Sequence, residues 1–336
     1  MVTVLVTGAT GRQGGAVADL LLERGHEVIA YVRSPESPAA RGLSAKGARL
    51  APGDLADATA LTKAAAAADA VFGLSVPFGA GGKEQEVAQG RLLIDVAAQL
   101  GVHLLYSSVR GADRIVNSNV AHASSKQLVE AYLRDRDLPA TVLGPTYFME
   151  NTLNVAFNRL REGVLAMPLS PDKNLDQVTV LDIAGMAVHA LENPDQFVGK
   201  RIDLASDSVT GKQAAAALSD VLGRDIPYQQ LPVDQVRRWA GDEVANMFQR
   251  FEDNTYFLDI TGCGSSTRPC GGTRSPSGPK PSTGAACSTA DKPASVRAHV
   301  CRRSSARARP QRSLRVAGSH GPERPRGRAR SRCQCR

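Results

Sequence analysis

Residues 2–15 read VTVLVTGATGRQGG, and this stretch decides the fold of the chain. Val2 to Val6 form a short apolar run rich in β-branched residues, which is typical of a buried parallel strand. Thr7 and Gly8 end that run. From Ala16 the pattern becomes helical, with Gly25 as a C-cap. The stretch therefore predicts a strand, a glycine-rich turn and a helix.

Three glycines, Gly8, Gly11 and Gly14, lie in that turn. Gly8 permits a tight turn, Gly11 lets the backbone approach a pyrophosphate, and Gly14 lets the helix pack close to the strand. The free N–H groups at the positive end of the helix then receive the anion. A glycine triplet alone also fits a plain βα turn, but its place directly after the first strand favours dinucleotide binding. The other expected cofactor-binding residues of this turn are Thr10, Arg12 and Gln13.

The second strand, His26–Val32, ends at Arg33, about where such folds contact the adenosine ribose. A carboxylate at that position favours NAD, whereas a guanidinium suits a 2′-phosphate. Arg33, with Arg12 in the glycine turn, therefore predicts NADP(H) in preference to NAD(H). The alternative is a solvated surface arginine. After the third strand, Asp54 could accept from the adenine amine, although Asp is also an ordinary turn residue.

The formal charge of +8 is unevenly distributed along the chain. Of the 41 Lys and Arg residues, 17 follow residue 260, with two of the 33 acidic residues, so residues 1–260 carry a net charge of −7. All six cysteines also follow residue 260. The acidic body disfavours a nucleic-acid partner, and its lack of cysteine fits a reducing compartment. We see no signal peptide and no apolar run of membrane-spanning length, and we expect a cytoplasmic protein with no membrane partner.

Residues 261–336 lack Phe, Tyr, Trp, Ile, Met and Asn and contain one leucine, Leu314. They cannot bury a core, and we expect a disordered tail. An arginine-rich arm can bind the phosphates of nucleic acid. Cys333 and Cys335 could bind metal, but they are closer together than the usual zinc pair, and we predict no metal site. A GC-rich gene read out of frame after Ile260 would also give this composition, so the tail is a possible frameshift product.

Apolar strands alternate with helices through residues 1–260. This alternation predicts an α/β fold, a doubly wound parallel sheet (Rossmann fold) with right-handed crossovers. We expect an NAD(P)-binding Rossmann domain over residues 1–150, a small C-terminal α/β substrate lobe over 151–260, and the tail over 261–336. Ligands in such sheets lie at the carboxyl ends of the strands. The candidate active-site loops are Ser75–Gly82, Ser107–Ala123 and Gly144–Asn151.

The lobe is expected to begin with a helix near Leu153–Glu162. A strand over Gln177–Val180, a helix over Asp182–Glu192 and a strand over Lys200–Ala205 follow. A last helical stretch is expected around Val233–Phe251.

His122 and Lys126 are the candidate catalytic residues. They lie four residues apart near the start of a predicted helix, which places them on one face. After the fifth strand, Lys126 should point toward the nicotinamide ribose or the substrate, where it can bond ribose hydroxyls or lower the pKa of a neighbouring acid. His122 could serve as a general acid near neutral pH. The same spacing also fits an ordinary amphipathic helix with a polar N-terminus.

Further candidates follow three of the predicted strands. Ser75 begins the loop after the fourth strand, and we expect it to bind the cofactor. Ser107 ends the fifth strand and could bond a substrate carbonyl or cap the turn. Tyr147, Phe148 and Asn151 follow the sixth strand as a candidate substrate wall, although aromatic residues there as often pack a lobe.

Four segments, in order, resemble the NmrA-like family of atypical short-chain dehydrogenase/reductases, and the resemblance covers residues 2–260. They read VLVTGATGRQGGAVADLLLERGHEVIAYVRSP, EQEVAQGRLLIDVAAQLGVHLLYSS, AHASSKQLVEAYLRDRDLPATVL and PTYFMEN. The resemblance implies a Rossmann domain with NADP(H) at the Gly8/Gly11/Gly14 loop and Arg33. It also implies that Lys126 occupies the family's lysine position, and that Tyr147, Phe148 and Asn151 bound a cleft.

One position departs from the pattern of the larger superfamily. Its typical members carry a Tyr as catalytic acid four residues before the Lys, and this chain has His122 there. The resemblance implies two kinds of activity, because some NmrA-like proteins reduce quinones or dyes, and others sense the redox state of the dinucleotide and signal to partner proteins. A histidine at the position of His122 is similar to the pattern of the sensors.

We expect an NADP(H)-dependent reductase of small electrophilic acceptors such as quinones. The alternative is a non-catalytic NADP(H) redox sensor. The partner is accordingly a small-molecule acceptor or a regulatory protein.

Overall fold

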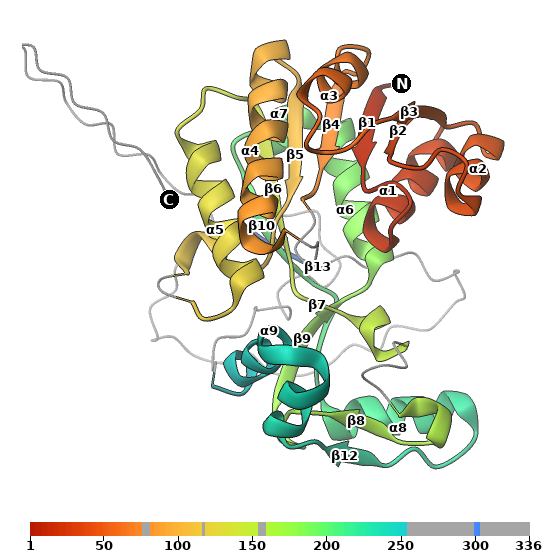
Figure 1. The fold of residues 1–336 in the computed structure, drawn as a ribbon. Coiled ribbons are helices and arrows are strands. Elements are labelled where there is room, and N and C mark those ends of the chain that lie inside the picture. Colours follow the sequence, from red (N-terminus) through yellow and green to blue (C-terminus); the bar gives the residue numbers. More distant parts are fainter. Residues whose placement is uncertain (76–80, 116–117, 154–158, 254–298, 303–336) are drawn as a thin grey trace, which may run out of the picture. The chain divides into compact units, whose positions relative to one another are not determined.

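The main sheet is built from strands that the chain visits in an order typical of a Rossmann fold. The computed structural model describes residues 1–75, 81–115, 118–153, 159–253 and 299–302. The strands of the sheet are β1 (Thr3–Thr7), β2 (Glu27–Val32), β3 (Arg49–Pro52), β4 (Ala70–Gly73), β5 (His103–Ser107), β6 (Ala140–Pro145), β10 (Arg201–Ala205) and β13 (His299–Arg302). Their spatial order is β13-β10-β6-β5-β4-β1-β2-β3. Neighbouring strands are parallel except for β13, which is antiparallel to β10. The predicted doubly wound sheet is confirmed (Figure 1).

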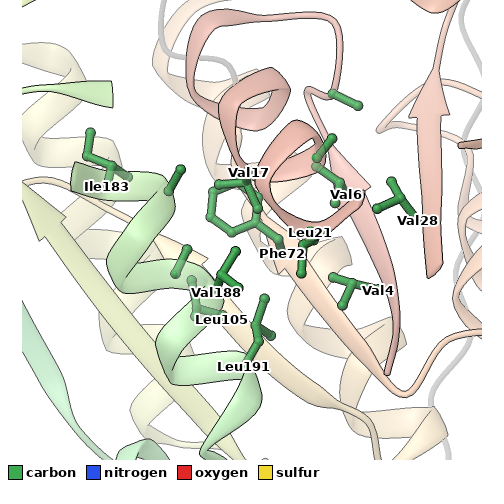
Figure 2. Packing of buried hydrophobic residues seen from close by; sticks show 14 of the residues in the cluster. Val4, Val6, Val17, Leu21, Val28, Phe72, Leu105, Ile183, Val188 and Leu191 are labelled. Carbon is green, nitrogen blue, oxygen red and sulfur yellow. The ribbon is translucent and has the colours of Figure 1, made fainter. Parts of the chain in front are cut away.

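Helices cover both faces of this sheet (Figure 1). The covering helices are α1 (Arg12–Glu23), α2 (Pro38–Ala45), α3 (Ala58–Ala65), α4 (Gly82–Leu100), α5 (Ala121–Arg134) and α6 (Val180–Glu192), and a short α7 (Pro194–Phe197) follows α6. Alternate residues of β1 serve the two faces, as the period of a strand requires. Val4 and Val6 pack with α1 and α6 (Figure 2), whereas Leu5 packs with α3 and α4.

A small lobe follows the carboxyl end of β6. It contains the strands β7 (Tyr147–Phe148), β9 (Asn174–Val178) and β11 (Asp207–Thr210) in one sheet, the pair β8 (Leu165–Met167) and β12 (Tyr228–Gln230), and the helices α8 (Gly211–Leu222) and α9 (Val233–Asp253). Leu165, Leu175, Ile226 and Phe248 are central to its separate core. A lobe of this kind was predicted, and in Figure 1 it lies beside the carboxyl end of the parallel strands, the end at which sheets of this type commonly bind ligands.

The lobe does not occupy an unbroken range from residue 151. Helix α6 packs against α1, and its Ile183 and Val188 share the sheet core with Val4 and Phe72 (Figure 2). Strand β10 pairs with β6 in the main sheet. Two elements expected in the lobe therefore belong to the Rossmann unit, because the chain leaves the sheet after β6 and returns to it through α6.

Two further expectations differ from the structure. The helix expected near Leu153–Glu162 is replaced by the 3₁₀ segments η2 (Met149–Leu153) and η3 (Leu160–Glu162), with residues 154–158 outside the described part. Within the tail, residues 299–302 form β13 and extend the edge of the sheet. Such pairing uses backbone groups and needs no core-forming side chains. Cys333, Cys335 and the rest of the tail lie outside the described residues.

Candidate functional site

The glycine turn joins β1 to α1 at the carboxyl end of the sheet. Gly8 has φ +62°, a left-handed conformation that favours glycine. A Cβ added at Gly14 would lie 2.4 Å from the carbonyl oxygen of Gly8 and 2.8 Å from that of Thr7. Only a hydrogen at this position lets α1 approach the strand so closely. The predicted conformational roles of Gly8 and Gly14 therefore have a geometric basis.

The N-terminus of α1 is suited to an anion. The helix begins at Arg12 after Gly11, no side chain caps it, and its first turn contains no acidic residue. Thr10, Gly11 and Arg12 are exposed there. The first N–H groups of a helix have no intrahelical acceptor, and with the helix dipole they favour negative charge. The turn thus fits the pyrophosphate of a dinucleotide.

Arg33 and Asp54 lie beyond the carboxyl ends of β2 and β3. The Arg33 side chain is exposed, and no described residue forms an ion pair or hydrogen bond with it. Asp54 is also exposed, but its Oδ1 accepts from the Ala56 N–H at 2.9 Å and so stabilises a turn. Arg33 is free to meet a phosphate, whereas the carboxylate of Asp54 already has a structural partner.

Arg12 does not join Arg33. Its Nη1 donates to the carbonyl oxygen of Glu150 and to Oδ1 of Asn151, both at 3.4 Å. In this structure the Arg12 side chain is therefore not placed beside Arg33, and their joint contact with a 2′-phosphate stays a prediction. The long Arg12 side chain reaches η2 instead and connects the glycine turn to the segment that leads into the lobe.

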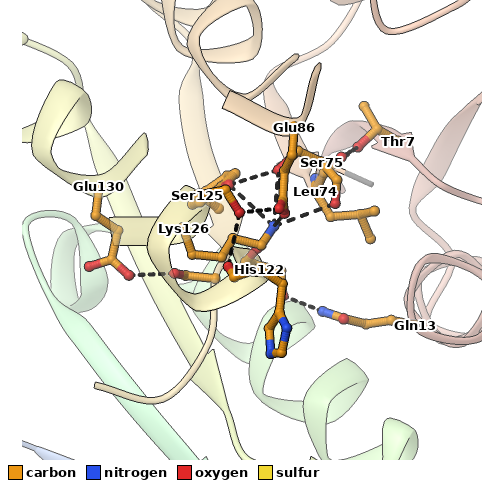
Figure 3. Close-up of polar contacts among 12 residues, drawn as sticks. Thr7, Gln13, Leu74, Ser75, Glu86, His122, Ser125, Lys126 and Glu130 are labelled. Carbon is orange, nitrogen blue, oxygen red and sulfur yellow. Dashed lines mark hydrogen bonds and ion pairs between the residues drawn. The ribbon is translucent and has the colours of Figure 1, made fainter. Parts of the chain in front are cut away.

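Lys126 lies in a buried polar cluster between β4, β5, α4 and α5 (Figure 3). Its Nζ is 3.0 Å from Oε1 of Glu86 and donates to Oγ of Ser75 at 3.0 Å and to the Tyr106 hydroxyl at 3.3 Å. It also donates to the carbonyl oxygen of Ser107 at 3.3 Å. Lys126 is 5% exposed and Glu86 is fully buried. The ammonium therefore ties together the ends of two adjacent strands.

The protonation of this cluster follows from its burial and its charges. Burial alone would lower the pKa of Lys126, but Tyr106 and the Glu86 carboxylate outweigh it, and the pKa is raised. Burial raises the pKa of the Tyr106 phenol. At neutral pH the Lys126 side chain is therefore an ammonium and the Tyr106 side chain a neutral phenol.

Gln13 and Ser107 meet at the edge of the sheet. Nε2 of Gln13 donates to Oγ of Ser107 (Figure 3). A predicted cofactor residue of α1 thus bonds a predicted substrate residue of β5. Ser107 is buried, and through its carbonyl oxygen it also contacts Lys126.

His122 does not point toward Lys126. In Figure 3 its imidazole is directed away from the buried cluster. Its Nδ1 donates to Oε1 of Glu243 at 2.5 Å, and the Glu243 carboxylate also accepts from the N–H groups of Ala121 and His122. Glu243 of α9 therefore caps α5 and fixes the candidate acid. His122 and Lys126 both lie in α5, four residues apart, but their side chains turn toward different elements, His122 toward Glu243 of α9 and Lys126 toward Glu86 of α4.

We expect the hydrogen bonds from α5 to the Glu243 carboxylate to contribute less to the stability of the fold in acid. Burial opposes ionisation of Glu243, but the bonds to His122 and Ala121 outweigh it and lower its pKa from 4.5 to about 2. A carboxyl with a lowered folded-state pKa stabilises the fold above its unfolded pKa and loses that contribution as the pH falls through the folded value. Glu243→Gln should cost about 0.5–2 kcal/mol at neutral pH, as for loss of a helix cap.

Urea unfolding across a pH series measures this effect. The difference between the wild type and Glu243→Gln should shrink as the pH falls from about 4.5 toward about 2. The exposed Asp253 of the same helix provides a control, and Asp253→Asn should show no comparable pH-dependent difference. If the difference in the free energy of unfolding between wild type and Glu243→Gln did not change with pH, the proposed contribution of the ionised Glu243 carboxylate would be contradicted.

Tyr147 and Phe148 face different cores. Tyr147 packs in the lobe, with ring centroids 5.9 Å from Phe248 and 6.2 Å from Phe251. Phe148 packs against the core of the main sheet. Neighbouring residues of a strand point to opposite sides, so the two cannot line one wall. Tyr147 and Asn151 line a small pocket together, and Phe148 does not.

A second charged cluster connects β10 with α5. Arg201 pairs with Glu130 and Asp203, and Arg114 reaches Asp203 at 3.0 Å. Ser108 donates to Glu130. The carboxylates outweigh burial and raise the pKa of Arg201. This network joins α5 to the sheet and positions the helix that carries Lys126.

Sequence reasoning missed Glu86 and Glu243. A signal for Glu86 exists, because Glu86, Gly90, Leu93 and Ala97 share the buried stripe of α4 at helical spacing. A carboxylate on such a stripe requires a charged partner. No comparable signal marks Glu243, whose role depends on how α9 meets α5.

Comparison with known proteins identifies the family. The sequence profile of the NmrA-like family matches residues 2–268. The chain belongs to the NmrA-like family. The resemblance noted from the sequence is thereby confirmed. Its similarity extends to an NAD(P)H azoreductase of Xenophilus azovorans, 30% identical over 240 residues, which cover 70% of this chain and 79% of that one.

Two solved structures are also similar to this chain. The NADPH-dependent quinone oxidoreductase of Escherichia coli complexed with NADPH shares 27% identity at a TM-score of 0.62, over 73% of this chain and 87% of that one. NmrA, a negative transcriptional regulator, in complex with NADP, shares the fold at 23% identity and a TM-score of 0.65, over 80% and 88%.

The described part of this NmrA-like chain contains neither a membrane-spanning helix nor a cluster of metal-binding side chains. Within it, no helix is long and apolar enough to cross a membrane. The same residues contain no group of three or more His, Cys, Asp or Glu side chains that could hold a metal ion.

Proposed function

We propose that this NmrA-like protein is an NADP(H)-dependent reductase of small electrophilic acceptors such as quinones. The observation that carries the proposal is the glycine turn, where the Gly14 contact and the uncapped N-terminus of α1 form a cradle for a pyrophosphate. Its azoreductase and quinone oxidoreductase relatives support reduction as the reaction. When bound, NADPH supplies a hydride.

The residues of this chain have distinct parts in the proposal. Gly8, Gly11 and the first turn of α1 bind the pyrophosphate, and Arg33 binds the 2′-phosphate. Lys126 is a positioning residue, because its ammonium holds the Ser75 and Ser107 ends of β4 and β5 rather than facing open space. His122, fixed by Glu243, is the candidate proton donor.

We expect Arg33→Ala to reduce the preference for NADPH over NADH. Loss of one charge-assisted contact should weaken NADPH binding by about 1.5–3 kcal/mol, which is roughly 10- to 150-fold, and leave NADH binding unchanged. Calorimetric titration of both cofactors measures the effect. Arg41→Ala provides a matched control, since Arg41 is another exposed arginine nearby, and its cofactor affinities should not change. Equal affinities of the wild type for NADPH and NADH would contradict the role of Arg33.

NADPH oxidation by the full chain tests the reaction. Assays with 1,4-naphthoquinone and with an azo dye should show consumption that requires both protein and acceptor. His122→Ala should cost roughly 10²–10⁴ in turnover if protonation limits the rate, with cofactor binding retained. Unchanged turnover would remove His122 from the mechanism and leave the reductase function in place.

A second candidate function is a non-catalytic NADP(H) sensor. Both candidate catalytic groups are engaged within the protein, Lys126 with Glu86 and His122 with Glu243, and this observation favours the sensor. A sensor would bind NADPH without turnover on either acceptor. It would also change conformation or assembly between NADPH and NADP⁺, which small-angle scattering can detect.

A further inference from the structure

The 3₁₀ segment η2 joins the lobe to the Rossmann unit. It follows β7, which pairs with β9 of the lobe. No residue of η2 is buried, so apolar packing contributes little to its stability and its position depends on polar contacts. One of these contacts runs to the start of α6, where the Val180 N–H donates to Oε1 of Glu150 at 3.0 Å.

Arg12 supplies two further contacts to η2. Its Nη1 donates both to the carbonyl oxygen of Glu150 and to Oδ1 of Asn151. Among the described residues, no acceptor bonds the Nε and Nη2 groups of Arg12. Those two groups form one edge of the planar guanidinium, and such an edge can bind a phosphate through two parallel hydrogen bonds. Arg12 can therefore bind a phosphate and η2 at the same time.

The position of Arg12 indicates which phosphate this edge can reach. Arg12 is the first residue of α1, so its side chain begins at the helix end that is suited to the pyrophosphate. Its guanidinium extends to η2, which follows β6 and β7, whereas Arg33 follows β2. In the sheet, β6 and β2 lie on opposite sides of β1. The guanidinium therefore extends away from Arg33, and the pyrophosphate is the phosphate group at its own end of α1.

We propose that Arg12 binds the pyrophosphate of the dinucleotide through its Nε–Nη2 edge while its Nη1 stays bonded to η2. The inference rests on the proposed function and adds regulation to the same site. Because one guanidinium makes both sets of bonds, binding of the dinucleotide and ordering of η2 stabilise each other. The two effects are reciprocal and share one coupling free energy. The dinucleotide thereby positions the segment that leads into the lobe.

Calorimetric titration of the full chain with NADPH and with NADH tests the phosphate contact. Arg12→Ala should weaken both by a similar factor, roughly 10- to 150-fold for a charge-assisted contact, because both dinucleotides contain the pyrophosphate. Arg24→Ala is the matched control, since Arg24 is an exposed arginine at the other end of α1, and it should leave both affinities unchanged. A loss confined to NADPH would assign Arg12 to the 2′-phosphate and overturn the proposal.

A double-variant cycle tests the bridge between the pyrophosphate and η2. Asn151→Ala removes one acceptor of Nη1 and should weaken NADPH binding about two- to twelvefold, as expected for one hydrogen bond. In the Arg12→Ala background the same change should have no further effect, because its influence on the dinucleotide passes through the guanidinium. Arg12→Lys should retain part of the affinity but lose its dependence on Asn151, since an ammonium has no second edge. Equal losses from Asn151→Ala in both backgrounds would overturn the bridge.

Hydrogen–deuterium exchange followed by mass spectrometry measures the reciprocal effect on η2. Saturating NADP⁺ should slow exchange in the wild-type peptide that contains residues 149–153 by about two- to twelvefold. In Arg12→Ala, with NADP⁺ again at saturation, that peptide should exchange at the same rate with and without the dinucleotide. An unchanged rate in the wild type, or equal slowing in Arg12→Ala, would contradict the coupling.

The outcomes also distinguish this inference from the proposed function. Coupled binding of NADPH and ordering of η2 without NADPH oxidation would support the bridge and overturn the reductase. NADPH oxidation by a protein in which Arg12 and Asn151 affect NADPH affinity independently would support the reductase and overturn the bridge.

Discussion

Glu86→Gln is expected to lower the free energy of unfolding by about 3–5 kcal/mol at neutral pH. The substitution keeps the shape of the side chain but leaves the Lys126 ammonium buried without its counter-charge. Hydrogen bonds from Lys126 to Ser75 and Tyr106 cannot replace a carboxylate 3.0 Å away. Urea unfolding followed by circular dichroism measures the loss.

Two controls sharpen this experiment. Glu84→Gln changes an exposed carboxylate in the same helix and should stay within about 0.5 kcal/mol of the wild type. The double variant Glu86→Leu with Lys126→Met replaces the whole pair by apolar residues and should cost much less than the two single changes added together. If the loss of unfolding free energy in the double variant equalled the sum of the losses in the two single variants, an energetic coupling between Glu86 and Lys126 would be contradicted.

The pH dependence of this pair has the opposite sign to that of Glu243. Because the folded-state pKa of Lys126 is raised, its contribution to stability is present below the unfolded value of 10.5 and is lost as the pH rises through the folded value. The gap between wild type and Glu86→Gln should therefore persist through the neutral range.

Gly14→Ala is expected to abolish measurable NADPH binding and to destabilise the fold by about 1–3 kcal/mol. The new Cβ would meet the Gly8 carbonyl oxygen at 2.4 Å and its carbonyl carbon at 2.6 Å. These are backbone atoms, so β1 and α1 must separate and the pyrophosphate cradle opens. Calorimetry with NADPH and thermal unfolding measure the two effects.

Gly42→Ala is the control for that substitution. Gly42 lies within α2, and an added Cβ there meets no atom within 4 Å. Alanine in a helix restricts the unfolded chain, so this variant should be neutral or more stable by up to about 1 kcal/mol. If Gly14→Ala behaved like Gly42→Ala, the close approach of α1 to β1 would have no energetic consequence.

The fold was predictable because its signals are local. The run Val2–Val6 followed by a glycine turn predicts the first strand and helix from neighbouring residues, and each later alternation repeats the pattern. The strand Lys200–Ala205 was recognised as a strand, but its pairing with β6 was not. That pairing depends on a return of the chain through α6 after a long excursion, which no local pattern records.

The site was predictable where backbone conformation defines it and less so where long side chains do. Gly8 and Gly14 have the geometry that their spacing implies. Arg12 and His122 were placed by spacing, and Lys126 by spacing and by the family resemblance, and each turns toward a partner on a distant element. Those partners, Asn151, Glu86 and Glu243, are 139, 40 and 121 residues away along the chain.

Equilibrium titration of the full chain with NADPH, followed by calorimetry, tests the central claim most directly. Both the reductase and the sensor require a dinucleotide at the glycine turn. The two functions differ in whether the bound NADPH is then oxidised by an acceptor. The account predicts saturable binding of one NADPH per chain, tighter than that of NADH and lost in Gly14→Ala. Absence of saturable binding, or NADPH binding that survives Gly14→Ala unchanged, would contradict it.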